Sequence, residues 1–245
     1  MAAAADKRLA GRTVAAVACF DSFGKMAMTL LAACRHQGAD TTLHLLEINN
    51  RALSRRQRLE IRRTDPRTRI EKHRWNEFRQ LTRAMADNVD VLVLGLDGRR
   101  SRDALLILAE EWKGTTRRPL LVSAYPGILF RFALEGMLDR SGVDLLCLNS
   151  TQDLELYQQG CRALGQDSSN AVVTGLPILW KTPQHQPPTD HPSIVFFEQP
   201  SVPVHPVQRH FLCQELKHLA EAWPQHPVIF KPRTSSIEST LHRRH

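Results

Sequence analysis

Short apolar runs alternate with amphipathic segments along the first 180 residues. Residues 13–20 (TVAAVACF) have the apolar character of a buried strand, whereas 25–38 has helical spacing and stops at Gly38. Further strand-like runs are 41–48, 89–96, 118–125, 143–149 and 170–179. Because near-continuous apolar strands alternating with helices are typical of a parallel sheet covered on both faces, we expect an α/β domain with a doubly wound, Rossmann-like sheet over residues 1–179.

Polar residues before the helical segments predict where these helices begin. Ser54 is expected to cap a helix in an arginine-rich stretch, which Asp65 and Pro66 interrupt. Ser101 is expected to cap the helix that follows residue 96. Ser150, with Asp153 three residues later, has the spacing of a capping box.

The composition changes after residue 179. Residues 180–192 (WKTPQHQPPTDHP) contain four prolines and few apolar side chains, which predicts a linker. A strand at 193–199, a helix at 205–223 and a strand at 227–232 then predict the βαβ start of a second Rossmann-like domain. Since about fifty residues are too few to bury a sheet of their own, we expect this domain, 193–245, to be C-terminally incomplete.

The net charge of +8 is concentrated in one segment. Between Arg51 and Arg83, twelve basic residues stand against four acidic ones. Such a basic surface attracts an anionic partner, or it is only the solvated surface of soluble helices. Trp75 and Phe78 are the only aromatic rings in the segment, and this scarcity argues against nucleic acid, whose bases stack on rings.

The cysteine pattern and the absence of targeting signals indicate a cellular compartment. Five cysteines are scattered without a CxxC pair, as in reduced cytosolic proteins. Neither a signal peptide nor an apolar run of about 20 residues is present. We therefore expect a cytoplasmic protein, and residues 51–83 leave open a peripheral contact with the inner face of the cell membrane. The eleven histidines form no HExxH motif, so no metal is expected.

Ligands of an open parallel sheet bind at the carboxyl ends of its strands, where strand order reverses. The expected strand ends are followed by four stretches: residues 21–25, 96–100, 123–127 and 149–151. In the first, Gly24 would allow a tight turn close to a ligand, and the amides of the next helix could hold an anion. Alternatively, Ser22 only caps that helix. The stretch FDSFGK (20–25) matches neither GxGxxG nor GxxxxGK[ST], which argues against a dinucleotide or P-loop site.

Two further stretches carry candidate binding residues. Tyr125, Pro126 and Gly127 would form a sharp turn that presents an aromatic face to a sugar or base, or a purely structural turn. Near the C-terminus, Lys231 and Arg233 flank Pro232 after a strand and could hold a phosphate. Glu238 and His242, four residues apart, would share one face if the segment is helical.

Several stretches resemble a known group of enzymes. NSTQDLELYQQGCRALG (149–165) followed by AVVTGLPIL (171–179) looks like the end of the N-terminal half of a GT-B glycosyltransferase. IVFFEQPSVP (194–203) is similar to the first strand of its donor half, and VIFKPRTSSIESTLH (228–242) to a later strand end of that half. The layout resembles an uncharacterised family of bacterial, cyanobacterial-type glycosyltransferases of GT-B-like fold.

The resemblance implies transfer of a sugar, of hexosyl or sialyl type, from a nucleotide sugar to a polysaccharide or lipid-linked acceptor, without a metal or other cofactor. Asp21 would be the general base, on an acceptor side formed with Ser22, Phe23, Gly24, Lys25, Tyr125, Pro126 and Gly127. The donor side would comprise Gln199, Lys231, Arg233, Glu238 and His242. A nucleotide-sugar epimerase or glycerophosphotransferase-like enzyme is an alternative. A different class of alternative is a non-catalytic basic module that binds RNA or a partner protein.

Overall fold

The computed structural model describes residues 7–48, 52–129, 133–180, 193–198, 203 and 205–231. It divides the chain into two units, Met1–Thr182 and Pro183–His245, and each is described by itself. The division falls within the segment 180–192 that the sequence assigns to a linker. Because 181–192 lie outside the described residues, the linker stays a prediction.

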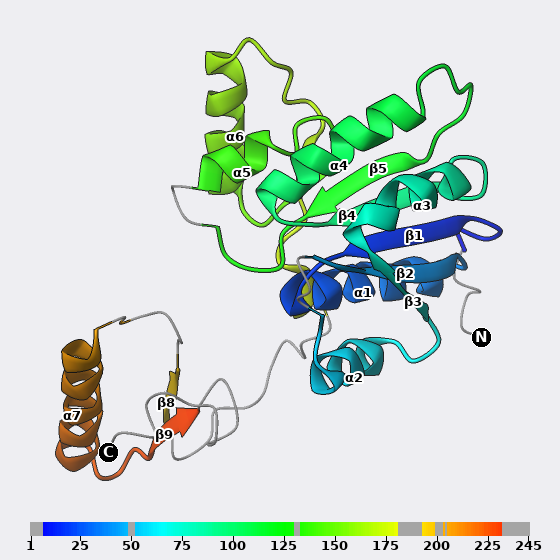
Figure 1. Cartoon of the computed structure of the whole chain (residues 1–245). Helices are drawn as coiled ribbons and strands as arrows, with labels where there is room; N and C mark the ends of the chain where they lie inside the picture. Colours follow the sequence, from blue (N-terminus) through cyan, green and yellow to red (C-terminus); the bar gives the residue numbers. More distant parts are fainter. Residues whose placement is uncertain are drawn as a thin grey trace, which may run out of the picture. The chain divides into compact units, whose positions relative to one another are not determined.

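The N-terminal unit is built on a seven-stranded sheet whose neighbouring strands all pair in parallel, in the order β3-β2-β1-β4-β5-β6-β7 (Figure 1). Its strands are β1 (Thr13–Ala18), β2 (Asp40–Glu47), β3 (Arg69–Arg74), β4 (Val91–Gly95), β5 (Leu120–Ala124), β6 (Leu145–Leu148) and β7 (Ala171–Val173). The helices between them are α1 (Asp21–His36), α2 (Arg55–Thr64), α3 (Phe78–Met85), α4 (Gly98–Glu111), α5 (Leu134–Leu138) and α6 (Thr151–Ala163). The predicted Rossmann-like α/β fold is confirmed.

Two separate apolar clusters hold helices against the two faces of the sheet. One cluster joins Leu31 of α1 and Ile61 of α2 to Leu43 of β2. The other joins Phe78 of α3 and Leu108 of α4 to the alternate residues of the strands, whose side chains point to the other face. Because successive strand side chains point to opposite faces, this division explains why the strands are apolar on both sides.

Strand β3 was not predicted from the sequence. Its residues RIEKHR contain one aliphatic side chain, and none of the six is buried. The strand forms because its backbone pairs with β2, from Thr42 opposite Arg69 to Glu47 opposite Arg74. A charged strand at the edge of a sheet also discourages pairing with another chain. A search for apolar runs in the sequence therefore misses β3.

The helix starts were predicted with mixed success. Ser54 caps α2, as expected, in a capping box with Gln57. Of the capping box expected at Ser150, only the bond from the N–H of Asp153 to Oγ of Ser150, at 3.2 Å, is formed. The prediction for Ser101 was wrong: Asp97 caps α4, its carboxylate accepting the N–H of Arg100 at 2.9 Å. Ser101 lies buried inside the helix and donates to the carbonyl of Leu96.

The C-terminal unit contains the expected βαβ arrangement. Strand β8 (Ile194–Phe197), helix α7 (Pro206–Ala222) and strand β9 (Val228–Lys231) follow one another, and the two strands pair in parallel. Phe196 and Phe230 stack with ring centroids 5.5 Å apart. No residue of α7 is buried within the described part of this unit. Among the helices of the described ranges, none is long and apolar enough to cross a membrane.

Candidate active site at the carboxyl ends of the strands

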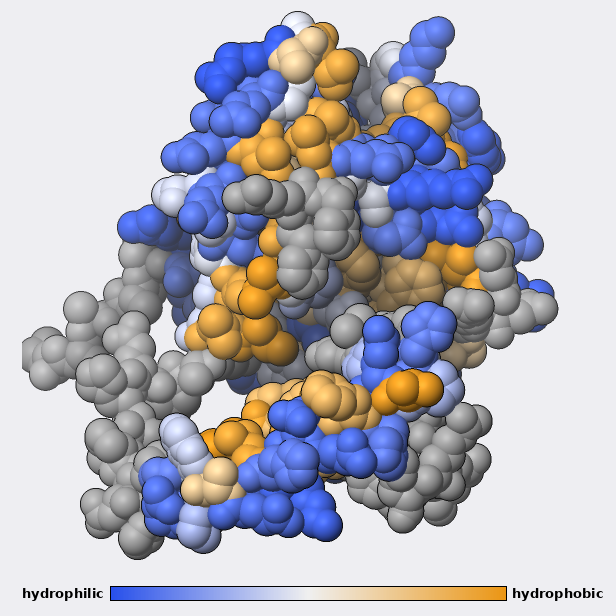
Figure 2. Space-filling model, turned by 90° about the vertical axis from the view of Figure 1, so that its left-hand side faces the viewer, coloured by the Kyte–Doolittle hydropathy of each residue, from blue (hydrophilic) through white to orange (hydrophobic). Residues whose placement is uncertain are grey.

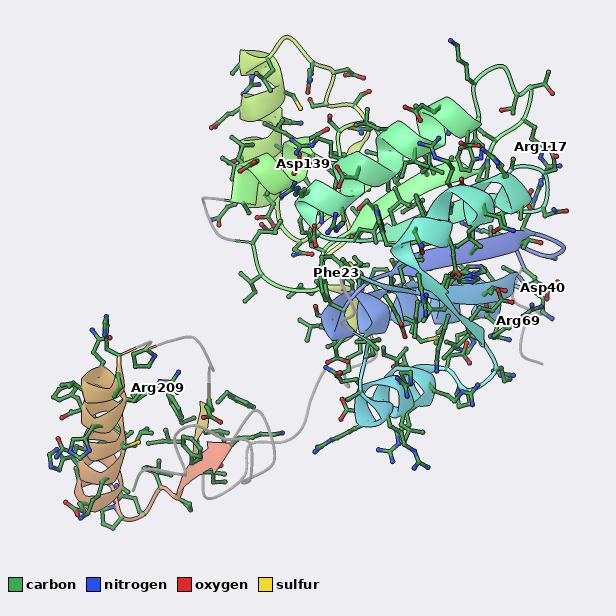
Figure 3. All side chains as sticks on the ribbon, in the orientation of Figure 1. Phe23, Asp40, Arg69, Arg117, Asp139 and Arg209 are labelled. Atoms are coloured by element: carbon green, nitrogen blue, oxygen red, sulfur yellow. The ribbon has the colours of Figure 1, made fainter. Side chains whose placement is uncertain are left out.

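The strand order reverses between β1 and β4, which makes their carboxyl ends the expected ligand site. In Figure 3, Phe23 lies near the carboxyl ends of the strands, whereas Asp40 and Arg117 lie near their amino ends. The two strand ends are joined by a hydrogen bond from the N–H of Cys19 to the carbonyl of Gly95, at 3.1 Å. A Cβ on Gly95 would lie 3.3 Å from the carbonyl of Phe23, so this glycine lets the start of α1 approach β4 closely.

Phe20 makes the turn from β1 into α1. Its φ of 62° and ψ of 161° make it the one non-glycine residue with positive φ in the described ranges. Such a conformation costs on the order of 1–3 kcal/mol and persists only where surrounding structure enforces it. As the N-cap residue, Phe20 has no side-chain acceptor for the first amides of α1, which are thus free of a side-chain cap. The strained turn therefore leaves the first amides of α1 without a side-chain cap at the place where the strand order reverses.

The roles predicted for Gly24 and Ser22 need correction. Both lie inside the first turns of α1, which begins at Asp21, so Gly24 makes no turn and Ser22 is exposed without capping the helix. A Cβ on Gly24 would lie 2.6 Å from Cδ1 of Ile61. The glycine thus allows the close contact between α1 and α2, and the turn itself is made by Phe20.

Asp21 and Lys25 form a charged group with Glu60 of α2. The Nζ of Lys25 donates to Oδ2 of Asp21 at 2.9 Å and to Oε2 of Glu60 at 2.8 Å. Burial alone would lower the pKa of Lys25, but these two carboxylates raise it above its usual value. Lys25 is consequently held as a cation between two acids, and its charge is already balanced.

The second oxygen of Asp21 has no such partner. Oδ1 is buried and accepts no hydrogen bond from any described residue. Since buried polar atoms are almost always hydrogen-bonded, this oxygen is an unusual acceptor that the described residues leave unsatisfied. Nearby, burial raises the pKa of the Cys19 thiol to about 11, which keeps it protonated and a poor nucleophile.

Tyr125 does not present its ring to a ligand, so that prediction was wrong. The residue is 5% exposed, and the Arg140 guanidinium lies 4.5 Å from the centre of its ring. Arg140 also donates to the Tyr125 hydroxyl at 3.3 Å. Beyond the buried ring, Pro126 and Gly127 are partly exposed, and the side chain of Asn149 donates to the Gly127 carbonyl at 2.7 Å. The structural turn is the better description of this stretch.

Arg140 is a buried cation that sequence reasoning missed. It is 2% exposed and donates to the carbonyls of Leu96 and Gly136 as well as to Tyr125. Its guanidinium thereby fastens the loop after β4 to the loop after β5. No local pattern signals this role, because the partners are as far as 44 residues away along the chain.

Another aromatic residue, Trp75, lies at the end of a strand. Trp75 follows β3, stacks on Phe78 with ring centroids 5.2 Å apart, and has the guanidinium of Arg100 5.3 Å from its ring centre. Arg100 belongs to the stretch 96–100, which the sequence analysis selected because it follows the end of an expected strand. The contact joins the segment after β3 to the first turn of α4, and sequence reasoning could not show it because β3 was missed.

Apolar side chains are exposed in several of the strand-end loops. Ile128, after β5, is 74% exposed, and Phe20 after β1 and Ile178 after β7 are also exposed. Figure 2, which views this side of the molecule, shows hydrophobic surface interrupting hydrophilic surface. A hollow of about 880 Å³ lies elsewhere, along α4 and α5, and is lined mostly by apolar helix residues. None of its lining residues belongs to the strand-end stretches 21–25, 96–100, 123–127 and 149–151, so it is not part of the candidate site.

The basic segment 51–83 does not form one continuous cationic surface. Arg79 contacts Glu110 at 2.8 Å and Glu111 at 2.6 Å, and Arg83 also contacts Glu111. These pairs neutralise the arginines of α3. On α2, Arg55, Arg62 and Arg63 are exposed, and the exposed Arg56 pairs with Glu60 at 3.2 Å. Contact with a membrane or another anionic partner stays a prediction for this helix.

In the C-terminal unit, Lys231 is the one candidate donor-side residue that the structure describes. It ends β9, is exposed, and its Nζ lies 5.6 Å from the centre of the Phe197 ring. The N–H of Glu198 donates to the Lys231 carbonyl at 3.0 Å, so the ends of β8 and β9 lie side by side. The other candidates, Gln199, Arg233, Glu238 and His242, lie outside the described residues.

Comparison with known proteins places the chain in a family. The model of the family described as "Putative glycosyltransferase (DUF6716)" matches residues 14–245. The chain belongs to this family. The match includes both units and confirms the resemblance to glycosyltransferases, whereas the bacterial origin and the GT-B subtype stay predictions. No curated protein matches the chain.

A solved structure has a similar fold. It is described as "Crystal structure of LpCGTa in complex with UDP" and is 10% identical in sequence, with a TM-score of 0.54. The alignment covers 92% of this chain and 71% of that one. At this identity the likeness supports the Rossmann-like fold of the DUF6716 chain and nothing finer.

Proposed function

We propose that this member of the DUF6716 family transfers a sugar from a nucleotide sugar to a hydroxyl of a polysaccharide or lipid-linked acceptor. The observation that carries the proposal is the family match over residues 14–245. A nucleotide donor is further supported by the UDP bound in the structural neighbour. We further propose that the transferred sugar is of hexosyl or sialyl type.

In this proposal Asp21 is the general base on the acceptor side. Lys25 holds Oδ2, so the carboxylate has a fixed orientation and Oδ1 is free to accept the proton of an acceptor hydroxyl. The hydroxyl oxygen then bonds to the anomeric carbon as the bond from that carbon to the phosphate oxygen breaks. The proton passes to Asp21, and the electron pair of the broken bond leaves with the nucleotide.

The leaving nucleotide gains negative charge, which a fixed cation stabilises. Lys231 is the cation proposed for this task, together with Arg233. Lys25 is unsuited to it because two carboxylates already balance its charge. No metal or other cofactor is required in this scheme. The exposed arginines of α2 are proposed to contact anionic lipid headgroups at the inner face of the cell membrane, where a lipid-linked acceptor would be found.

Donor binding tests this assignment. We expect saturable binding of at least one of UDP-, CMP- or GDP-sugars to the chain by calorimetric titration. Lys231→Ala combined with Arg233→Ala should weaken it at least about tenfold, since each lost charged contact is worth roughly 1.5–3 kcal/mol. Lys217→Ala is a matched control, because Lys217 is an exposed lysine of the same unit whose only described ion pair is with Glu221 at 4.0 Å. Equal weakening by the control, or no binding of any donor, would contradict the proposal.

A further inference from the structure

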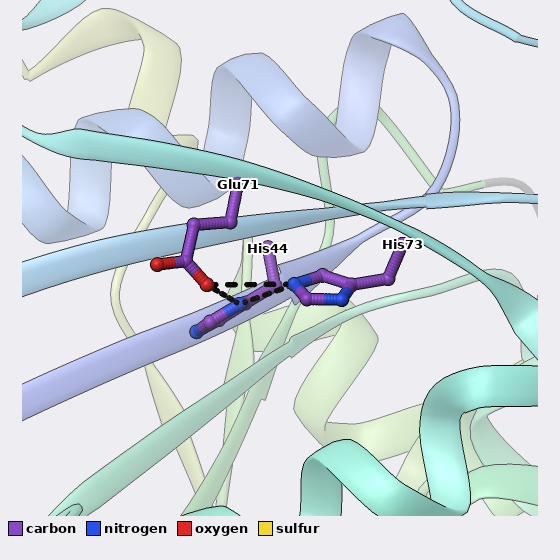
Figure 4. Close-up of side chains that lie close together, drawn as sticks. All are labelled: His44, Glu71 and His73. Atoms are coloured by element: carbon purple, nitrogen blue, oxygen red, sulfur yellow. Dashed lines mark hydrogen bonds and ion pairs between the residues drawn. The ribbon is translucent and has the colours of Figure 1, made fainter.

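Three side chains with metal-binding atoms, on two neighbouring strands, lie close together (Figure 4). Nδ1 of His44 lies 3.1 Å from Nε2 of His73 and 3.3 Å from Oε2 of Glu71. Nε2 of His73 lies 3.5 Å from the same Oε2. One possible ligand atom from each residue therefore lies within 3.5 Å of the other two.

The convergence follows from strand geometry. His44 of β2 stands directly opposite Glu71 of β3 in the parallel register. Glu71 and His73 are two residues apart on β3, so their side chains share one face of the sheet. By the same alternation this is the face that carries Leu46, which packs in the cluster with Phe78 of α3. The pairing of β3 with β2 thus builds the group, and no sequence spacing reveals it.

The three distances match the requirements of one ion. A tetrahedral zinc ion with bonds of about 2.0–2.1 Å holds its ligand atoms about 3.3 Å apart, which agrees with the separations above. We propose that His44, Glu71 and His73 form a zinc site that links the edge strand β3 to β2. Two imidazoles and one carboxylate leave a fourth position for water.

Exposure and neighbouring charge fit this role. The Glu71 and His73 side chains are 27% and 23% exposed, which gives an ion a path from solvent to the buried His44. Arg69 contacts Oε1 of Glu71, and this contact leaves Oε2 facing the imidazoles. Ligating carboxylates are commonly held in this way by a hydrogen bond to the other oxygen. The positive charge of Arg69 opposes a dication, but its side chain is 75% exposed and well screened by water.

The site differs from the candidate active site in position and task. Its ligands lie in the middle of β2 and β3, whereas the candidate active site lies where β1 and β4 end. It takes no part in the proposed transfer. Its expected effect is to fix the polar edge strand, which has no buried residue of its own.

Zinc binding by the full chain without an affinity tag tests the inference. After chelator treatment, we expect calorimetric titration with Zn²⁺ to give one ion per chain and Zn²⁺ to raise the Tm. His73→Ala should weaken binding by tenfold or more and abolish the rise in Tm, and Glu71→Gln should do likewise if His73→Ala does not fold. His36→Ala is the matched control, because His36 is an exposed histidine at the end of α1, and this variant should bind as the unaltered chain does.

Cobalt substitution identifies the ligands independently. We expect the visible absorption of tetrahedral Co²⁺ without the near-ultraviolet charge-transfer band of a thiolate ligand. A thiolate band would mean that cysteines hold the ion, and it would overturn the inference. Absence of stoichiometric Zn²⁺ binding, or equal binding by the unaltered chain and by folded His73→Ala or Glu71→Gln, would also overturn it and leave a hydrogen-bonded histidine pair.

Discussion

Lys25 holds one carboxylate oxygen of Asp21 at 2.9 Å and leaves the other without a partner among the described residues. The pair lies in the first turns of α1, which starts from the strained turn at Phe20. This combination orients a carboxylate at the switch point of the sheet without neutralising both of its oxygens. The acceptor side of the proposal depends on it.

Replacing Asp21 by Asn should remove the proposed general base while keeping the size of the side chain. We expect sugar transfer to fall by about 10²–10⁴-fold, the usual contribution of a positioned base, with unchanged donor affinity. The measurement is nucleotide release with acceptor present. Asp87→Asn, at an exposed aspartate after α3, is the matched control and should retain full activity. An active Asp21→Asn enzyme would remove Asp21 from the mechanism.

Gly24→Ala tests the contact between α1 and α2. Alanine is the better helix former, yet its Cβ would lie 2.6 Å from Cδ1 of the buried Ile61. We expect the overpacking to dominate and to lower the free energy of unfolding by about 1 kcal/mol or more, measured by denaturant titration.

The control for this contact removes the clashing methyl group. In the double variant Gly24→Ala, Ile61→Val the steric conflict is relieved, so the cost should be smaller than the sum of the two single costs. Additive costs would show that Gly24 is required for another reason.

Arg140→Ala should destabilise the N-terminal unit. The substitution removes the Arg140 donor from the Gly136 carbonyl and one of the two side-chain donors of the Leu96 carbonyl, which keeps Ser101, and it opens a cavity beside Tyr125. We expect a loss of about 3 kcal/mol of unfolding free energy, since each buried unsatisfied acceptor costs roughly 1–3 kcal/mol. The exposed Arg162 provides the control, with a change within about 0.5 kcal/mol on substitution by Ala. A similar effect of both substitutions would show that Arg140 does not fasten the loops.

The two tyrosines of the chain give a direct pH test of the core. Burial raises the pKa of Tyr125 to about 12, and it also raises the pKa of Tyr157. Ultraviolet titration should therefore detect almost no tyrosinate in the folded protein at pH of about 10–11, whereas both phenols ionise near pH of about 10 in denaturant.

The corresponding effect on stability has a defined sign. Because the folded pKa of Tyr125 is the higher one, its contribution is fully present below pH of about 10 and is lost as pH rises through about 12. A tyrosinate signal that appears near pH of about 10 while the protein remains folded would contradict the burial of these rings.

The sequence predicts the fold better than the site, for a physical reason. Apolar runs are local, so strands such as β1 and β4 can be recognised from them, whereas β3 depends on its pairing with β2 and carries almost no apolar signal. The expectation that ligands bind at strand ends selected the segments that contain Asp21 and Arg100, which do follow β1 and β4, and their part in a site stays a prediction. It could not reveal that α1 begins at Asp21, nor that Tyr125 is covered by Arg140, because each depends on the surrounding tertiary structure.

Turnover of nucleotide sugars is the measurement that tests the central claim most directly. The chain is incubated with UDP-, CMP- and GDP-sugars, each with and without polysaccharide and lipid-linked acceptors, and the free nucleotide is measured. We predict acceptor-dependent nucleotide release from one donor class, with the sugar recovered on the acceptor. Release of no nucleotide from any donor by the folded chain, which also fails to bind them, would contradict the assignment as a glycosyltransferase.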